Sequence, residues 1–510
     1  MTPAASTVGH RVPPDEESLE PSTEQNGFAN GAPDGSPPSP SSLTPKAPRA
    51  LAPDLLRGLL MAFMALDHNQ VGLNGWPHGT SFNTPEADSA VVTGWNWWMA
   101  YAVRTLSHLC APGFTFLMGM GVAYFGRSRS RLGWSAARMA RHFVVRGVVL
   151  TLVSVGMGFI LTQGQVWFLN VVLVALAVDY VLVGLLWLLI ARTEPALAAV
   201  IDGLVKEGGE RTPLLLHTGH GTAPRKPSPS AERISWHAHN LALLVLAFIT
   251  IWWNHWLSPT GGSCASTAHV DIPATGSTTS NFWHFWFFEI MSPRVVSPFP
   301  PLAWLSFAIM GLLYGRVVLA RPRYVSEQVG GHAATAAVFA LLFVLTRLLR
   351  VGNLSDGCLH TPDQAGSAEG SNSYLASAAS FFYIVKYPPD LAFFSFTLAG
   401  TFTLLAAFTS VPQKASERYG FALLAFGQSA LFFYVTHMVV LLSGVGLLLH
   451  FFGHDTGLPP PMDGRPAVGV DNLWLWWANW AAVMLIMYPL CRWYGAFKKT
   501  RSADSVWRFF

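Results

Sequence analysis

Long apolar runs, separated by shorter polar segments, fill most of the chain beyond residue 50. Each run approaches the ~20 residues that a helix needs to cross a bilayer. We place ten such runs at 51–68, 98–124, 142–162, 165–190, 239–257, 298–319, 333–350, 388–410, 420–448 and 473–494. The pattern predicts an all-α fold, a polytopic transmembrane helical bundle of about ten spans.

The first fifty residues follow no such pattern. They are rich in Pro, Ser, Gly and Glu and hold no sustained apolar run, so they cannot bury enough surface to fold. The run at 51–68 is long enough to stay as a span, which argues against a signal peptide. We therefore expect a disordered cytosolic tail at 1–50, a membrane domain at 51–495 and a cytosolic tail at 496–510.

Composition agrees with a protein of the bilayer. The chain has 510 residues, of which 51% are hydrophobic and only 12% charged, and its mean hydropathy is positive. A net charge of +4, scattered among apolar runs, excludes a nucleic-acid-binding protein. The 17 histidines show no zinc-binding spacing and the four cysteines no CxxC pair, so we expect no metal. Membrane lipids are the expected partners, and assembly with identical subunits stays open.

Charged residues alternate between consecutive loops. Basic residues precede the first span and follow the even-numbered spans, whereas the odd-numbered loops carry mainly Asp and Glu. The most basic loop follows the second span and contains Arg127, Arg129, Arg131, Arg138 and Arg141. Because basic loops face the cytosol, both termini are predicted to be cytosolic, in an endomembrane or the plasma membrane.

Tryptophans cluster where the second and tenth spans begin. Their positions predict anchors in the membrane interface, namely Trp95, Trp97 and Trp98 in one group and Trp474, Trp476, Trp477 and Trp480 in the other.

Two loops that the charge pattern places outside each contain one cysteine. Cys264 and Cys358 would face an oxidising compartment, and we predict a disulfide between them. Asn353 begins an N-glycosylation sequon on the same face, but it lies so close to the end of the seventh span that we expect it to be unused.

The first span carries ionisable residues, which persist in a membrane only where they face the bundle interior or a wet cavity. Arg57 and His68 are eleven residues apart, within about 20° of one helix face and roughly 16 Å apart along the axis. Arg57 either pairs with Asp54 as a structural ion pair or binds a substrate. Asp67 beside His68 is typical of a tuned general base, although a polar helix end in interfacial water remains the alternative.

The second span contains Arg104, His108 and Pro112 at intervals of four residues. A proline ring clashes with the carbonyl four residues back, here that of His108, so the helix should kink there at about mid-bilayer. His108 then either performs chemistry in the opened space or is a buried histidine bonded to a neighbouring helix. Gly119 further on is suited to a close helix contact.

Three further polar residues are candidates for substrate binding. Lys386 opens the eighth span, where a cation opposes the helix dipole and could serve an anionic or carbonyl partner, or snorkel to the interface. His437 lies in the outer half of the ninth span and could face the same cavity. Asn170, near the outer end of the fourth span, has an interhelical hydrogen bond as its simpler role.

Five stretches resemble, in this order, the polytopic membrane family grouped with the catalytic domain of heparan-alpha-glucosaminide N-acetyltransferase. They are PDLLRGLLMAFMALDH, HLCAPGFTFLMG, FPPLAWLSFAIMGLLYGR, KYPPDLAFFSFTLAG and FGQSALFFYVTH, and the resemblance covers almost everything beyond residue 50. It implies transfer of an acetyl group from cytosolic acetyl-CoA to an acceptor across the membrane, with histidine involved. The characterised enzyme has an aspartate where this chain has His108, and its acetyl-carrying histidine has no clear counterpart here.

Two functions from different classes follow. The first is a transmembrane acyltransferase that uses acetyl-CoA and a hydroxyl or amine acceptor, a small molecule or glycan, with Asp67, His68 and His108 as catalytic candidates and Arg57 and Arg104 among the binding residues. The second is a transporter or lipid-handling protein without covalent chemistry. The sequence shows no convincing inverted repeat, which weakens the second.

Overall fold

The computed structural model describes residues 51–75, 97–209, 227–257, 282, 285–288, 290–291, 294–321, 323–354, 363, 368, 370–384, 386, 389–456, 467–502, 505 and 507. The predicted tail at 1–50 lies outside the described residues, as do Trp95, Cys264 and Cys358, so the predicted disulfide is not described either.

Helices dominate the described part, as predicted. The long ones are α1 (Ala52–Leu73), α2 (Trp97–Ser107), α3 (Cys110–Arg131), α4 (Ala136–Leu161), α5 (Leu173–Gly209), α6 (Pro229–Trp256), α8 (Leu305–Ala320), α9 (Val325–Leu349), α12 (Leu391–Ser410), α15 (Ala430–Phe452) and α16 (Leu473–Lys499). Taking α2 and α3 as one, nine helical segments of the described chain are long and apolar enough to cross a membrane. The all-α, multi-pass prediction is therefore confirmed.

Short elements connect these helices. They are η2 (Pro301–Trp304), η3 (Ser373–Leu375), α11 (Ala378–Phe382), α13 (Gln413–Tyr419) and α14 (Phe421–Gln428). Strand β3 (Val295–Ser297) pairs in parallel with β1 (Phe168–Leu169) and antiparallel with β2 (Ile290–Met291). A second small sheet joins β4 (His454–Asp455) to β5 (Val468–Gly469).

Helix α1, the first predicted span, is not among the nine apolar helices, and it carries Asp54, Arg57 and Asp67. It is packed inside the bundle, against α14, α15 and α16 among others, and several of its apolar side chains are fully buried. At its contact with α14 the backbones touch: a Cβ on Gly427 would lie 1.9 Å from the carbonyl oxygen of Asp54. Neighbouring helices thus bury Asp54, whereas Arg57 and Asp67 are partly exposed.

A second close pair, α3 and α8, forms the centre of the apolar core. A Cβ on Gly119 would lie 2.0 Å from the carbonyl oxygen of Ala308, and one on Gly311 would lie 1.9 Å from that of Phe116. The predicted role of Gly119 in close helix contact is confirmed. The core around this pair is aromatic and includes the fully buried Trp304, Phe307, Phe393, Phe394 and Phe402.

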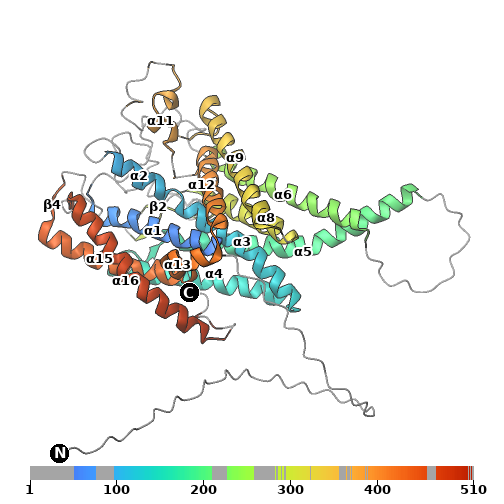
Figure 1. Cartoon of the computed structure of the whole chain (residues 1–510), viewed down its shortest axis with the longest axis horizontal. Coiled ribbons are helices and arrows are strands. Elements are labelled where there is room, and N and C mark those ends of the chain that lie inside the picture. Colours follow the sequence, from blue (N-terminus) through green and yellow to red (C-terminus); the bar gives the residue numbers. More distant parts are fainter. Residues whose placement is uncertain are drawn as a thin grey trace, which may run out of the picture. The chain divides into compact units, whose positions relative to one another are not determined.

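Several predicted boundaries were wrong. The run at 420–448 is two helices, α14 and α15, which are separated at Ser429. The run at 165–190 begins as the strand β1, and its helix, α5, continues to Gly209. Figure 1 shows this extended α5 beside α6, with which it forms a long helical hairpin.

The tryptophan prediction is correct only in part. Trp98 and Trp474 are exposed, as interface anchors should be. Trp476 is fully buried, and its indole N–H donates to Oε1 of Gln70 at 3.2 Å. Trp480 donates in the same way to the carbonyl of Ala62. These two residues attach α16 to α1 and are not simple anchors.

Candidate functional site

Two histidines that lie far apart in sequence meet between α1 and α15. Nδ1 of His68 lies 2.9 Å from Nε2 of His437. His437 is fully buried, and its Nδ1 lies 2.9 Å from the carbonyl oxygen of Phe433, one helical turn earlier. The ring of Phe433 stacks on His437 with centroids 5.1 Å apart. We call His68 and His437 the histidine pair.

The carbonyl of Phe433 selects the tautomers of the pair when both rings are neutral. A carbonyl oxygen only accepts, so Nδ1 of His437 carries a hydrogen, and in the neutral ring Nε2 is then an acceptor. Nδ1 of His68 must therefore donate to it. This leaves the basic lone pair of His68 on its Nε2. Protonation of that nitrogen changes neither hydrogen bond, so the pair is suited to a proton-accepting His68 held by a neutral His437.

Asp67 directly precedes His68 in α1, and Asp67 and Lys386 both lie near the buried thiol of Cys110. Cys110 is buried at the start of α3 and contacts the carbonyl of Leu60 at 3.3 Å. Lys386 is also buried, with Nζ 5.4 Å from the ring centroid of Phe299. The structure thus brings a carboxylate, an ammonium and a thiol into one region.

The predicted kink at His108 is confirmed, because α2 ends at Ser107 and α3 begins at Cys110. The His108 side chain is fully buried, and its ring meets the ring of Phe393 edge-on with centroids 5.4 Å apart. Aromatic contacts continue from Phe393 to Trp304 and from Trp304 to Phe299. His108 therefore lies among the aromatic side chains of the core, and its catalytic role stays a prediction.

Two buried arginines hold the segment that leads to Lys386. Arg104 donates to the carbonyl of Ile384 at 2.6 Å, and its guanidinium lies 3.9 Å from the ring centroid of Tyr383. Arg347, at the end of α9, donates to the carbonyl of Tyr383 at 2.7 Å and to Oδ1 of Asn353 at 2.7 Å. Arg104 is therefore placed to position the segment that contains Lys386. Sequence reasoning did not single out Arg347.

The side chain of Asn353 is held by hydrogen bonds within the protein. Its amide nitrogen donates to the carbonyl of Thr346 at 2.7 Å, its oxygen accepts from Arg347, and the residue is fully buried. An attached glycan would have to break these bonds, which agrees with the prediction of an unused sequon.

Two other predicted binding residues form structural contacts. Asn170 donates to Oγ of Ser297 at 2.9 Å and to the carbonyl of Phe299 at 2.7 Å, so it holds the loop against which Lys386 packs. Arg57 lies 3.2 Å from both Oδ1 of Asp54 and the carbonyl oxygen of Gly427, which ties α1 to α14. Arg57 and His68 lie near opposite ends of α1, about 16 Å apart along its axis.

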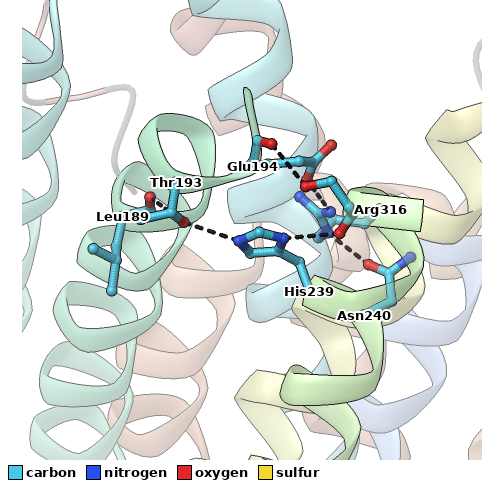
Figure 2. A network of polar contacts seen from close by, with 7 residues as sticks. Leu189, Thr193, Glu194, His239, Asn240 and Arg316 are labelled. Atoms are coloured by element: carbon cyan, nitrogen blue, oxygen red, sulfur yellow. Dashed lines mark hydrogen bonds and ion pairs between the residues drawn. The ribbon is translucent and has the colours of Figure 1, made fainter. Parts of the chain in front are cut away.

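A separate polar network joins α5, α6 and α8 (Figure 2). Arg316 donates to Oδ1 of Asn240 at 2.9 Å and contacts Oε2 of Glu194 at 2.5 Å. His239 contacts the hydroxyl of Thr193 at 3.0 Å. The network connects the α5–α6 hairpin to α8. None of its members was a candidate site residue in the sequence analysis.

Among the described residues, no group of three or more His, Cys, Asp or Glu side chains could hold a metal ion. No protein-family model matches the chain, and no curated protein matches it either. The family resemblance of the five stretches therefore stays a prediction.

Proposed function

We propose that the protein is an integral membrane acyltransferase. It would move the acetyl group of acetyl-CoA, bound from the cytosolic face, to a hydroxyl or amine acceptor on the far side, most simply a sugar. The observation that carries this proposal is the histidine pair, in which Nδ1 of His68 lies 2.9 Å from Nε2 of His437, so a neutral His68 that donates there keeps its basic lone pair on Nε2. The neighbouring Asp67 would stabilise the charge that His68 acquires as a base.

The reaction needs one proton acceptor and then one proton donor. As the acceptor oxygen or nitrogen attacks the thioester carbonyl carbon, its hydrogen would pass to Nε2 of His68. A carbon–oxygen or carbon–nitrogen bond forms, the carbon–sulfur bond breaks, and His68 returns the proton to the departing thiolate. The products are free coenzyme A and the acetylated acceptor. His437 stays neutral throughout and keeps its bond to His68.

Lys386 would contribute to the transition state. Negative charge develops on the carbonyl oxygen of the thioester, and a fixed cation away from water stabilises it far better than bulk solvent does. Lys386 is buried, and Arg104 and Arg347 hold the segment before it. At the donor end, Arg57 and arginines of the basic loops other than the one between α3 and α4 carry charge of the sign that the phosphates of acetyl-CoA require.

The decisive experiment follows the release of free coenzyme A by the purified full chain in phosphatidylcholine nanodiscs. Replacement of His68 by Ala should lower the rate about 10²-fold or more, because the only general base of the proposal is lost. His450 is an exposed histidine of α15 and supplies the matched control, so H450A should retain the wild-type rate.

The outcome separates the two functional classes. If the wild-type chain releases no coenzyme A with any hydroxyl or amine acceptor, the acyltransferase proposal fails, and a transporter or lipid-handling protein remains. If H68A inserts normally and keeps full activity, His68 is not the general base, and the histidine pair is a polar link between helices.

A further inference from the structure

The turn between α3 and α4 concentrates positive charge without any acidic residue close in sequence. No Asp or Glu occurs between Asp88 and Asp179. The guanidinium of Arg129 lies 4.7 Å from the ring centroid of Trp134, and that of Arg138 lies 4.0 Å from the same centroid. Two cations on one indole repel each other, so an anion bound beside them would stabilise the arrangement.

The turn is already organised for binding. The backbone N–H of Trp134 donates to the carbonyl of Arg129 at 3.0 Å, and Ser135 caps α4 by accepting from the N–H of Arg138. The indole of Trp134 also packs edge-on against Phe125, with centroids 5.9 Å apart. Both arginines and the ring between them are therefore fixed by local backbone and aromatic contacts.

The length of α4 indicates where the turn between α3 and α4 lies in the membrane. Helix α4 has 26 residues and is about 39 Å long, whereas the hydrocarbon core of a bilayer is about 30 Å thick. At least one end of α4 thus lies among lipid headgroups, and the polar, arginine-rich N-terminal end is the one suited to them.

The outer face of α4 supports contact with lipid. Val145, Val148 and Leu152 are exposed and follow one another at helical spacing, as on a lipid-facing stripe. Arg138 and Arg141 lie seven residues before Val145 and Val148, so they continue the same stripe towards the membrane surface. An anion bound here would come from the surrounding leaflet and not from the bundle interior.

We propose that Arg129, Trp134, Arg138 and Arg141, here called the arginine–tryptophan cluster, bind the phosphate of an anionic phospholipid headgroup. Guanidinium groups match phosphate oxygens in two-point hydrogen bonds, and tryptophan favours the headgroup level. The charge pattern of the loops places the turn in the cytosolic leaflet, which is the one rich in anionic lipid. This binding is independent of the acyl-transfer proposal.

The test measures lipid binding by the full chain. Purified protein in phosphatidylcholine nanodiscs is titrated with phosphatidylserine, and bound lipid is counted by native mass spectrometry. The double variant R129Q/R138Q should bind phosphatidylserine about 10- to 30-fold more weakly. The control R321Q/R323Q removes two charges from the short connection between α8 and α9 and should bind close to wild type.

Soluble competitors distinguish a lipid site from a site for free anions. If inorganic phosphate or acetyl-CoA displaces the lipid at equal concentration, the cluster is a free-anion site and the proposal is overturned. An equal loss in R129Q/R138Q and R321Q/R323Q, or unchanged binding in R129Q/R138Q, also overturns it. Should R129Q/R138Q not fold, R131Q/R141Q replaces two exposed arginines of the same turn, and retention of wild-type lipid binding by that variant overturns the proposal.

Discussion

At the scale of single residues, His437 has a role that follows from one backbone carbonyl. The oxygen of Phe433 fixes the hydrogen of His437 on Nδ1, which in turn fixes the orientation and tautomer of His68. In the proposed reaction His437 touches neither the acetyl donor nor the acetyl acceptor, so it is a positioning residue. Its effect on activity should depend on whether its side chain can accept a hydrogen bond from His68.

We expect H437Q and H437L to differ. The amide oxygen of glutamine can accept from Nδ1 of His68, whereas leucine leaves that N–H without an acceptor. The rate of coenzyme A release should therefore fall about 10²-fold in H437L and no more than about tenfold in H437Q. The dependence of the rate on pH should shift in H437L alone. Equal rates and identical pH profiles in both variants would show that the contact with His68 has no role in positioning.

Sequence alone could nominate the members of the site but not their partners. Asp67, His68, Lys386 and His437 stand out because ionisable groups are costly in apolar runs. His68 and His437 are 369 residues apart, and no periodicity relates them. Arg347 was missed because an arginine at the end of an apolar span reads equally well as a snorkelling residue. Its burial depends on a loop whose path is set by tertiary contacts.

At the scale of helices, the sequence predicts a helix boundary correctly where nearby residues determine it. Pro112 removes a backbone donor and clashes with the preceding turn, so the break between α2 and α3 could be predicted. The break at Ser429 has no proline beside it to indicate it in the sequence; the helix before it, α14, packs against α1. The extension of α5 to Gly209 was missed because its last turns are more polar than a span.

The contact between α1 and α14 yields an element-scale prediction. A Cβ at position 427 would lie 1.9 Å from the backbone oxygen of Asp54, which cannot move without displacing the helix. We expect G427A to separate α1 from α14 and to destabilise the protein by about 1–3 kcal/mol through overpacking. The midpoint of thermal unfolding in detergent measures the effect.

Gly446 supplies the control for that variant, since nothing lies within 4 Å of a Cβ built there and the residue is also in a helix. G446A should unfold at or slightly above the wild-type temperature, because alanine favours the helix. A G427A protein as stable as G446A would contradict the close approach of the two backbones.

At the scale of the whole molecule, the membrane topology depends on α1. Nine helical segments of the described chain suit a membrane span by length and composition, and α1 is excluded from them although it has 22 residues. Its charged side chains make it look unsuitable as an isolated segment. In the bundle, however, Leu56, Leu60 and Ala65 are fully buried, and Arg57 is bonded to Asp54 and Gly427. Protein surroundings therefore replace lipid along much of α1, so it can cross the membrane in spite of its charges.

The number of crossings fixes the sidedness of the termini, and this gives the last prediction. Ten crossings, with α1 included, return the chain to its starting side, whereas nine would leave the termini on opposite sides. The alternation of basic and acidic loops requires the even number, with both termini in the cytosol. In sealed vesicles with the cytosolic face outward, protease should remove tags fused at residue 1 and at residue 510. Protection of only the first tag would mean that α1 does not cross, and His68 would then lie on the same non-cytosolic side as that tag, away from the acetyl donor. Protection of both tags would mean that the topology is inverted and that the arginine–tryptophan cluster lies in the opposite leaflet.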